Sequence, residues 1–76
     1  MSHAQRPAAE QAIDQSRRQF AVRTLVRMAS QRCDVSVADA RNAESMAISA
    51  MEQGASAAMA VASTGKWLRS VQAAAH

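Results

Sequence analysis

The chain has 76 residues and a net charge of +3, and it is 49% hydrophobic, with one Phe, one Trp and no Tyr. A chain this short forms one small domain at most, and its many alanines bury little area, so its own core is thin. Small domains rely on disulfides, metals or association. The lone Cys33 cannot form an internal disulfide, and no Cys/His cluster could hold a metal. Association with another chain is therefore the remaining source of stability.

Residues 1–6 are predicted to be a disordered N-terminus, and this stretch lacks the apolar core of a signal peptide. The longest uncharged run, residues 53–65, is shorter than the roughly 20 apolar residues that a membrane span needs. A single unpaired cysteine fits a reducing compartment. We therefore expect a cytoplasmic protein without a membrane span.

A single domain is predicted over residues 7–76, and its first helix spans 7–33. Pro7 suits the first helical position because its missing N–H costs nothing there. Neither Gly nor a further Pro interrupts the chain before Cys33. Good helix formers dominate this stretch, so one long helix is expected.

The second helix is predicted over 37–63. Ser36, with Asp39 three residues later, has the spacing of a capping box. Beyond it, polar residues keep to one helical stripe across Gly54, which favours a continuous helix that ends before a left-handed Gly65. Gly54 as a helix cap is the alternative, since glycine costs a helix about 1 kcal/mol relative to alanine. Residues 66–75 are predicted to form a short third helix.

The short connection at residues 34–36 predicts that the two long helices form an antiparallel hairpin. The first helix is net basic and the second net acidic. Folding about this connection pairs residues whose numbers sum to about 71, and it predicts three ion pairs: Arg32–Asp39, Arg27–Glu44 and Arg18–Glu52. Each exposed pair contributes only about 0–1 kcal/mol, but together they favour this register.

The apolar arc of each long helix is wider than one neighbour can cover, because a helix that faces one partner needs a stripe of about 100°. The fold class predicted is therefore all-α: a two-helix hairpin with a short C-terminal helix, assembled into a bundle as a homodimer. A helix of a different protein is the second choice of partner. We expect the interface to consist of Ile13, Phe20, Met46, Ala50, Gly54, Ala57, Ala58, Val61, Trp67, Leu68 and Val71.

Some of these residues have two interpretations. Ile13 and Phe20 either anchor a foreign protein, or they pack in the homodimer or under the third segment, which is the favoured interpretation. The segment around Trp67 either docks in a partner groove or on an anionic membrane surface, or it folds back to cap the open end of the bundle, which is again the favoured interpretation. Gly54, Ala58 and Ala62, four residues apart, are expected to let another helix approach closely.

No nucleophile–base–orienter set can be assembled from these residues, so we expect no enzyme, no catalytic residue and no cofactor. The function predicted is a non-enzymatic protein-binding module: a small adaptor, chaperone or inhibitor that sequesters a partner protein. The alternatives are a structural subunit of a filament or larger assembly, and weak nucleic-acid binding through the arginines of the first helix, for which a solvated face is the simpler explanation. The stretch "ESMAISAMEQGASAAMAVAS" resembles the alanine-rich repeats of R-body proteins in composition, and this likeness assigns no role to any residue.

Overall fold

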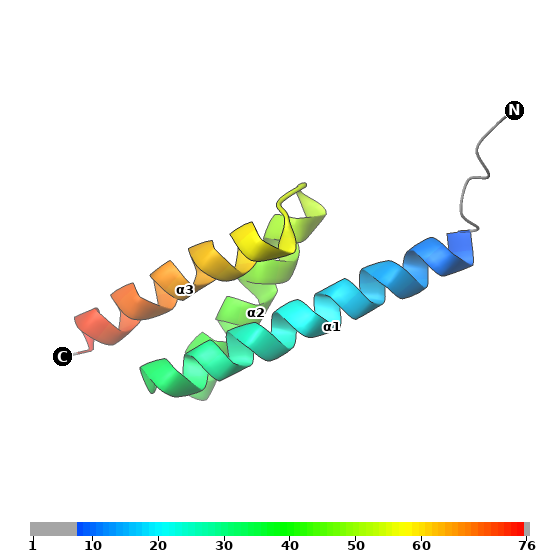
Figure 1. Cartoon of the computed structure of the whole chain (residues 1–76). Coiled ribbons are helices and arrows are strands. Elements are labelled where there is room, and N and C mark those ends of the chain that lie inside the picture. Colours follow the sequence, from blue (N-terminus) through cyan, green and yellow to red (C-terminus); the bar gives the residue numbers. More distant parts are fainter. Residues whose placement is uncertain (1–7, 76) are drawn as a thin grey trace, which may run out of the picture.

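The computed structural model describes residues 8–75 and shows an all-helical arrangement (Figure 1). Its helices are α1 (Ala8–Cys33), α2 (Val37–Glu52) and α3 (Ala57–Ala74), and each packs against the other two. α2 runs antiparallel to both neighbours. The predicted all-α class is confirmed, whereas the predicted disorder of residues 1–6 and the predicted helix start at Pro7 concern positions outside the described residues. No helix within residues 8–75 combines the length and apolarity of a membrane span.

The turn between α1 and α2 follows the sequence prediction closely. α1 ends at Cys33, and α2 begins at Val37 behind an N-cap, where the Ser36 hydroxyl accepts a hydrogen bond from the Asp39 amide at 3.1 Å. Asp34 adopts a left-handed φ of 53°, and the Val35 amide bonds back to the carbonyl of residue 30 at 3.5 Å. This is a Schellman ending, with aspartate in the place that glycine usually takes.

The turn between α2 and α3 repeats that construction twenty residues later, within the stretch that is predicted to be continuous helix. Gly54 has a φ of 107°, its amide bonds to the Met51 carbonyl at 3.0 Å, and the Ala55 amide bonds to the Ala50 carbonyl at 2.9 Å. Ser56 then caps α3, since its hydroxyl accepts from the amide of residue 59 at 3.1 Å. Both turns therefore join a left-handed residue to a serine N-cap two positions later.

The predicted second helix, 37–63, is thus wrong in extent, because it ends at Glu52. The polar residues keep a helical period in the sequence across residues 53–56, although the helix itself is broken there. Gly65 is an interior residue of α3 rather than a left-handed cap, and the predicted short helix 66–75 is the C-terminal part of a helix that begins at Ala57. The hairpin of two matched helices is accordingly replaced by three mutually packed helices.

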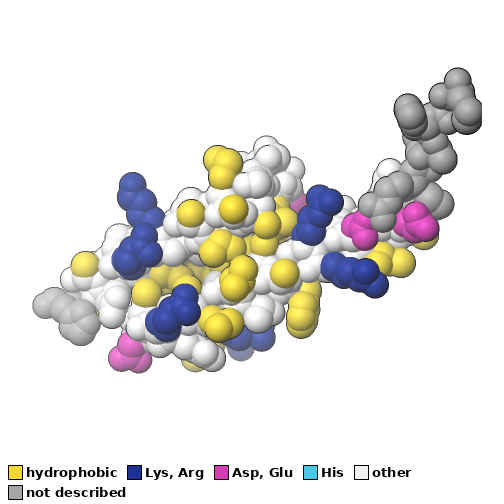
Figure 2. All heavy atoms as spheres, in the orientation of Figure 1, with side chains coloured by type: hydrophobic (Ala, Val, Ile, Leu, Met, Phe, Trp, Pro, Cys, Tyr) yellow, Lys and Arg dark blue, Asp and Glu magenta, His cyan; other side chains and the backbone are white. Residues whose placement is uncertain are grey.

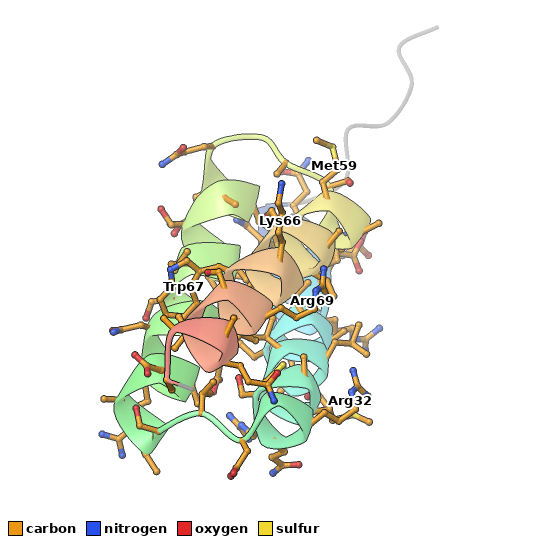
Figure 3. All side chains as sticks on the ribbon, turned by 90° about the vertical axis from the view of Figure 1, so that its left-hand side faces the viewer. Arg32, Met59, Lys66, Trp67 and Arg69 are labelled. Carbon is orange, nitrogen blue, oxygen red and sulfur yellow. The ribbon has the colours of Figure 1, made fainter. Side chains whose placement is uncertain are left out.

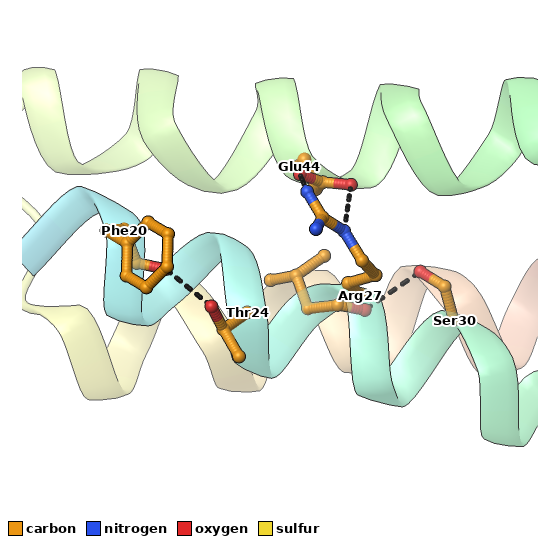
Figure 4. Close-up of polar contacts among 6 residues, drawn as sticks. Phe20, Thr24, Arg27, Ser30 and Glu44 are labelled. Carbon is orange, nitrogen blue, oxygen red and sulfur yellow. Dashed lines mark hydrogen bonds and ion pairs between the residues drawn. The ribbon is translucent and has the colours of Figure 1, made fainter.

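The core lies along the line where the three helices meet. α1 contributes Val22 and Val26, and α3 contributes Leu68, the bulkiest fully buried side chain. The other buried hydrophobic residues are small or come from α2: Ala43, Ala47, Ile48 and Ala60. Ser30 is also buried, and its hydroxyl donates to the Val26 carbonyl at 2.8 Å (Figure 4). The alanines let the helices approach closely, which explains how so few large side chains fill this core.

One of the three predicted interhelical ion pairs forms. The Arg27 guanidinium donates to the Glu44 carboxylate with an Nη2–Oε1 distance of 3.0 Å, linking α1 to α2 (Figure 4). Within residues 8–75, Arg32 and Asp39 do not pair, and neither do Arg18 and Glu52. The antiparallel register of α1 and α2 is nevertheless the predicted one at Arg27, midway along the contact.

Candidate protein-interaction surface

α1 is much longer than its neighbours, with 26 residues against 16 in α2 and 18 in α3. Its N-terminal half extends past the turn between α2 and α3 (Figure 1). No side chain from residue 9 to residue 21 is buried, and the first buried one is Val22. We call residues 9–20 the α1 arm. Because these side chains bury little area within the described chain, covering the apolar ones with a partner would stabilise the arm.

The outer face of the α1 arm carries the two exposed hydrophobic anchors. Ile13 exposes 52% of its surface and Phe20 exposes 73%, the largest fraction among the exposed large hydrophobic residues of the described chain. They are seven residues apart and lie on the same side of the helix. With Ala12, Ser16 and Arg17 they line a shallow hollow of about 550 Å³. The arm therefore presents an apolar surface that no other part of the described chain covers.

The opposite face of the arm is polar. Gln11, Gln15 and Gln19 follow one another at four-residue spacing and border a second hollow, which the turn between α2 and α3 closes on its other side. A core-facing helix would need apolar residues at these positions. The sequence of α1 therefore changes faces near its middle: its C-terminal half buries Val22 and Val26 in the bundle, and its N-terminal half directs Ile13 and Phe20 away from it.

Charge is also unevenly distributed along α1. Glu10 and Asp14 are its only acidic residues and lie near its N-terminal end, whereas Arg17 and Arg18 follow in the second half of the arm. Figure 2 shows acidic side chains at the projecting end of the molecule, with basic side chains next to them. The arm thus has an acidic half and a basic half.

A larger groove, of about 710 Å³, lies between α1 and α2. Arg23, Arg41 and the Arg27–Glu44 pair line its polar side, and Val37, which is 69% exposed, borders it. The hydrogen bond that Arg27 donates to Glu44, and then their charge attraction, raise the pKa of Arg27 above its ordinary value. A raised pKa favours the charged form of Arg27 in the fold, so its guanidinium is charged at neutral pH and loses its proton only in strong alkali.

The structure distributes the predicted interface residues over three environments. Besides Ile13 and Phe20, the exposed ones are Met46, Gly54, Ala57 and Ala58. Half-buried residues are Ala50, Val61, Trp67 and Val71, and Leu68 is completely buried. Predicting Leu68 at an interface was wrong, because its side chain lies in the core of its own chain.

The predicted close-contact face also differs in the structure. Gly54 lies in a turn, and Ala58 and Ala62 are exposed on α3, so these residues do not form one helical stripe and no helix of the described chain packs on them. The residues that α3 buries are Ala60, Thr64 and Leu68. The break at Gly54 shifts the buried stripe by two positions relative to the expectation.

Trp67 and its neighbours behave as part of the bundle. Trp67 packs against the buried cluster and lies on the side of α3 next to α2 (Figure 3). Lys66 and Met59 point outward from α3 in the same view, and Met59 is 66% exposed. Of the two interpretations of this segment, the structure places Trp67 within the chain's own packing.

Residues with metal-binding or nucleophilic chemistry do not gather in the described part of the chain. Within residues 8–75 no group of three or more His, Cys, Asp or Glu side chains is placed to hold a metal ion. Cys33 is a free, half-buried thiol that packs against the core at the end of α1. Among the features of the described chain, the α1 arm is therefore the one whose exposed apolar side chains most clearly call for a binding partner.

Comparison of the chain with protein-family models, with curated proteins and with solved structures finds no match. The compositional likeness of residues 44–63 to R-body repeats gains no support from these comparisons.

Proposed function

We propose that the chain is a non-enzymatic protein-binding module, a small adaptor or inhibitor whose docking element is the α1 arm. The observation that carries this proposal is the 73% exposure of Phe20 on a helix face that the rest of the described chain leaves open. Buried aromatic residues supply much of the binding energy at protein interfaces, and an amphipathic helix presents its anchors at the spacing that a hydrophobic groove or a second helix can receive.

Two features support an arm that functions by binding. Ile13 lies on the same face as Phe20, so the two form one contiguous contact rather than two isolated exposed residues. The other exposed large hydrophobic residues of the described chain are all less exposed than Phe20 and are distributed over all three helices: Leu25, Met28, Val37, Met46 and Met59. The three-helix bundle then serves as the scaffold that holds the base of the arm.

The test compares two single substitutions at exposed apolar residues. Phe20→Asp places a charge on the arm, and Met59→Asp places one on α3, where the residue it replaces is comparably exposed. Tagged wild type, and Met59→Asp as the control, are expected to capture the same partner from an extract of the native host and to bind it again after purification, whereas Phe20→Asp captures none. A partner retained equally by Phe20→Asp would remove the arm from the interface.

A further inference from the structure

The outer face of the α1 arm alternates small and large side chains. Ala9, Ile13, Ser16 and Phe20 follow at spacings of four, three and four residues, which keeps them on one side of a helix. The order along the arm is small, large, small, large. Read in the opposite direction, the same face gives large, small, large, small. Two copies of this face placed antiparallel therefore set each large residue opposite a small one.

The structure points to a second copy of this chain as the occupant of the arm, with the two α1 arms paired antiparallel about a two-fold axis. This inference depends on the proposed function, in which the arm is the docking element. Antiparallel pairing places Phe20 of each copy against Ala9 of the other, and Ile13 against Ser16. Large residues then fill the space beside small ones, as close packing between helices requires. Parallel pairing would instead oppose Phe20 to Phe20 and alanine to alanine.

The charges of the arm favour the same orientation. Glu10 and Asp14 occupy its first half, and Arg17 and Arg18 its second half. Antiparallel pairing brings the acidic half of each arm beside the basic half of the other, whereas parallel pairing aligns like charges. Antiparallel helices also oppose their dipoles favourably. A two-fold contact of this kind is closed, so it produces dimers rather than filaments.

The position of the arm makes this pairing sterically simple. Each arm projects beyond its own bundle (Figure 1), so two arms overlap with the two bundles at opposite ends. The contact is small, because each copy contributes two large hydrophobic side chains and stable interfaces bury roughly 1,200–2,000 Å² in total. We therefore expect a weak dimer, populated as the protein concentration rises.

The first experiment measures molar mass against concentration by sedimentation. Wild type is expected to move from one chain mass toward two as concentration rises, and Met59→Asp is expected to follow the same curve. Phe20→Asp is expected to remain at one chain mass throughout. Wild type that stays monomeric at every concentration, or Phe20→Asp that associates like wild type, would overturn the inference.

The second experiment determines orientation by cross-linking in a Cys33→Ala background. With a short bis-maleimide, Ser16→Cys is expected to cross-link to itself, because the two copies of residue 16 lie near the two-fold axis. Ala9→Cys is expected to give no product, because its two copies are about 16 Å apart along the helix axis. A dimer in which Ala9→Cys also cross-links is parallel, which contradicts the inference. Adding Phe20→Asp to Ser16→Cys should abolish the product and so controls for random collision.

The two proposals fail separately. A wild-type chain that is monomeric, yet captures another protein only when Phe20 is intact, refutes the second copy as occupant and retains the binding module. A chain whose dimer depends on Phe20, but which captures no other protein from the extract, retains the second copy as occupant and refutes the adaptor or inhibitor role.

Discussion

The chain has two leucines, and the structure gives them opposite environments, so they form a matched test of the fold. Leu68 is 0% exposed and lies where α3 meets the other helices, whereas Leu25 on α1 is 49% exposed. Leu68→Ala removes fully buried methyl groups and leaves a cavity, which costs about 3–5 kcal/mol of unfolding free energy. Leu25→Ala loses only part of a leucine's burial and gains slightly in helix propensity, so its cost is about 1 kcal/mol or less.

A domain of this length is expected to have a total stability on the order of 4–11 kcal/mol. Leu68→Ala therefore removes a large share of it and should lower the melting temperature by about 12 °C or more. Thermal unfolding of both variants, followed by far-ultraviolet circular dichroism at low concentration, measures the difference. Equal effects of the two substitutions would show that α3 does not pack its Leu68 face against α1 and α2, and the three-helix arrangement would have to be abandoned.

The remaining predictions concern the two turns and use the same thermal assay. Gly54→Ala should destabilise the fold by at least about 1 kcal/mol, because Gly54 has a φ of 107°. Gly65→Ala should be neutral or stabilise the fold by up to about 1 kcal/mol, since the added Cβ meets only the Arg69 side chain at 3.5 Å. The reverse order of the two effects would place the helix break at Gly65. Asp34→Gly should stabilise by up to about 1 kcal/mol, because Asp34 has a left-handed φ of 53°, and a loss of stability would contradict that conformation. Ser56→Ala should cost about 1 kcal/mol through loss of the α3 N-cap, and an effect no larger than that of an exposed mid-helix serine would argue against the cap.

The α1–α2 half of the fold could be predicted because its signals are local and agree with one another. Ser36 is followed by an acidic residue at the capping distance, and Arg27 pairs with Glu44 in the register that charge complementarity indicates. The end of α1 at Cys33 was also predicted, although its left-handed residue, Asp34, is not a glycine. Such interactions lie within a few residues of each other or repeat along a helix face, so a single sequence displays them.

The α2–α3 half was predicted wrongly because two signals conflicted. The polar stripe across residues 42–63 favoured continuity, whereas Gly54 with Ser56 two residues later marks a helix end followed by a new start. Asp34 and Ser36 form the same arrangement one helix earlier and indicate the same kind of turn. However, the helical period of the polar residues does not reveal a break at so short a turn. Core packing decides the outcome, since only a separate α3 can return to bury Leu68 against α1.

The candidate site was predicted in part for the same reason. Ile13 and Phe20 were recognised because they lie nearly opposite the apolar stripe of the rest of α1. The projecting arm itself could not be foreseen, since it results from the mismatch in length between α1 and α2, and that mismatch depends on the break at Gly54. The complementary small residues, Ala9 and Ser16, gain meaning only once the arm is known to stand clear of the bundle.

Hydrogen exchange of the backbone amides of the α1 arm, measured at increasing protein concentration, is the most direct test of the central claim that this segment is completed by another chain. In wild type we expect the arm amides to exchange rapidly at low concentration and to become protected as concentration rises, while amides of α2 remain protected throughout. In Phe20→Asp the arm should exchange rapidly at every concentration. Arm amides of wild type that are as protected as those of α2 in the dilute monomer would contradict the account, because the arm would then need no partner.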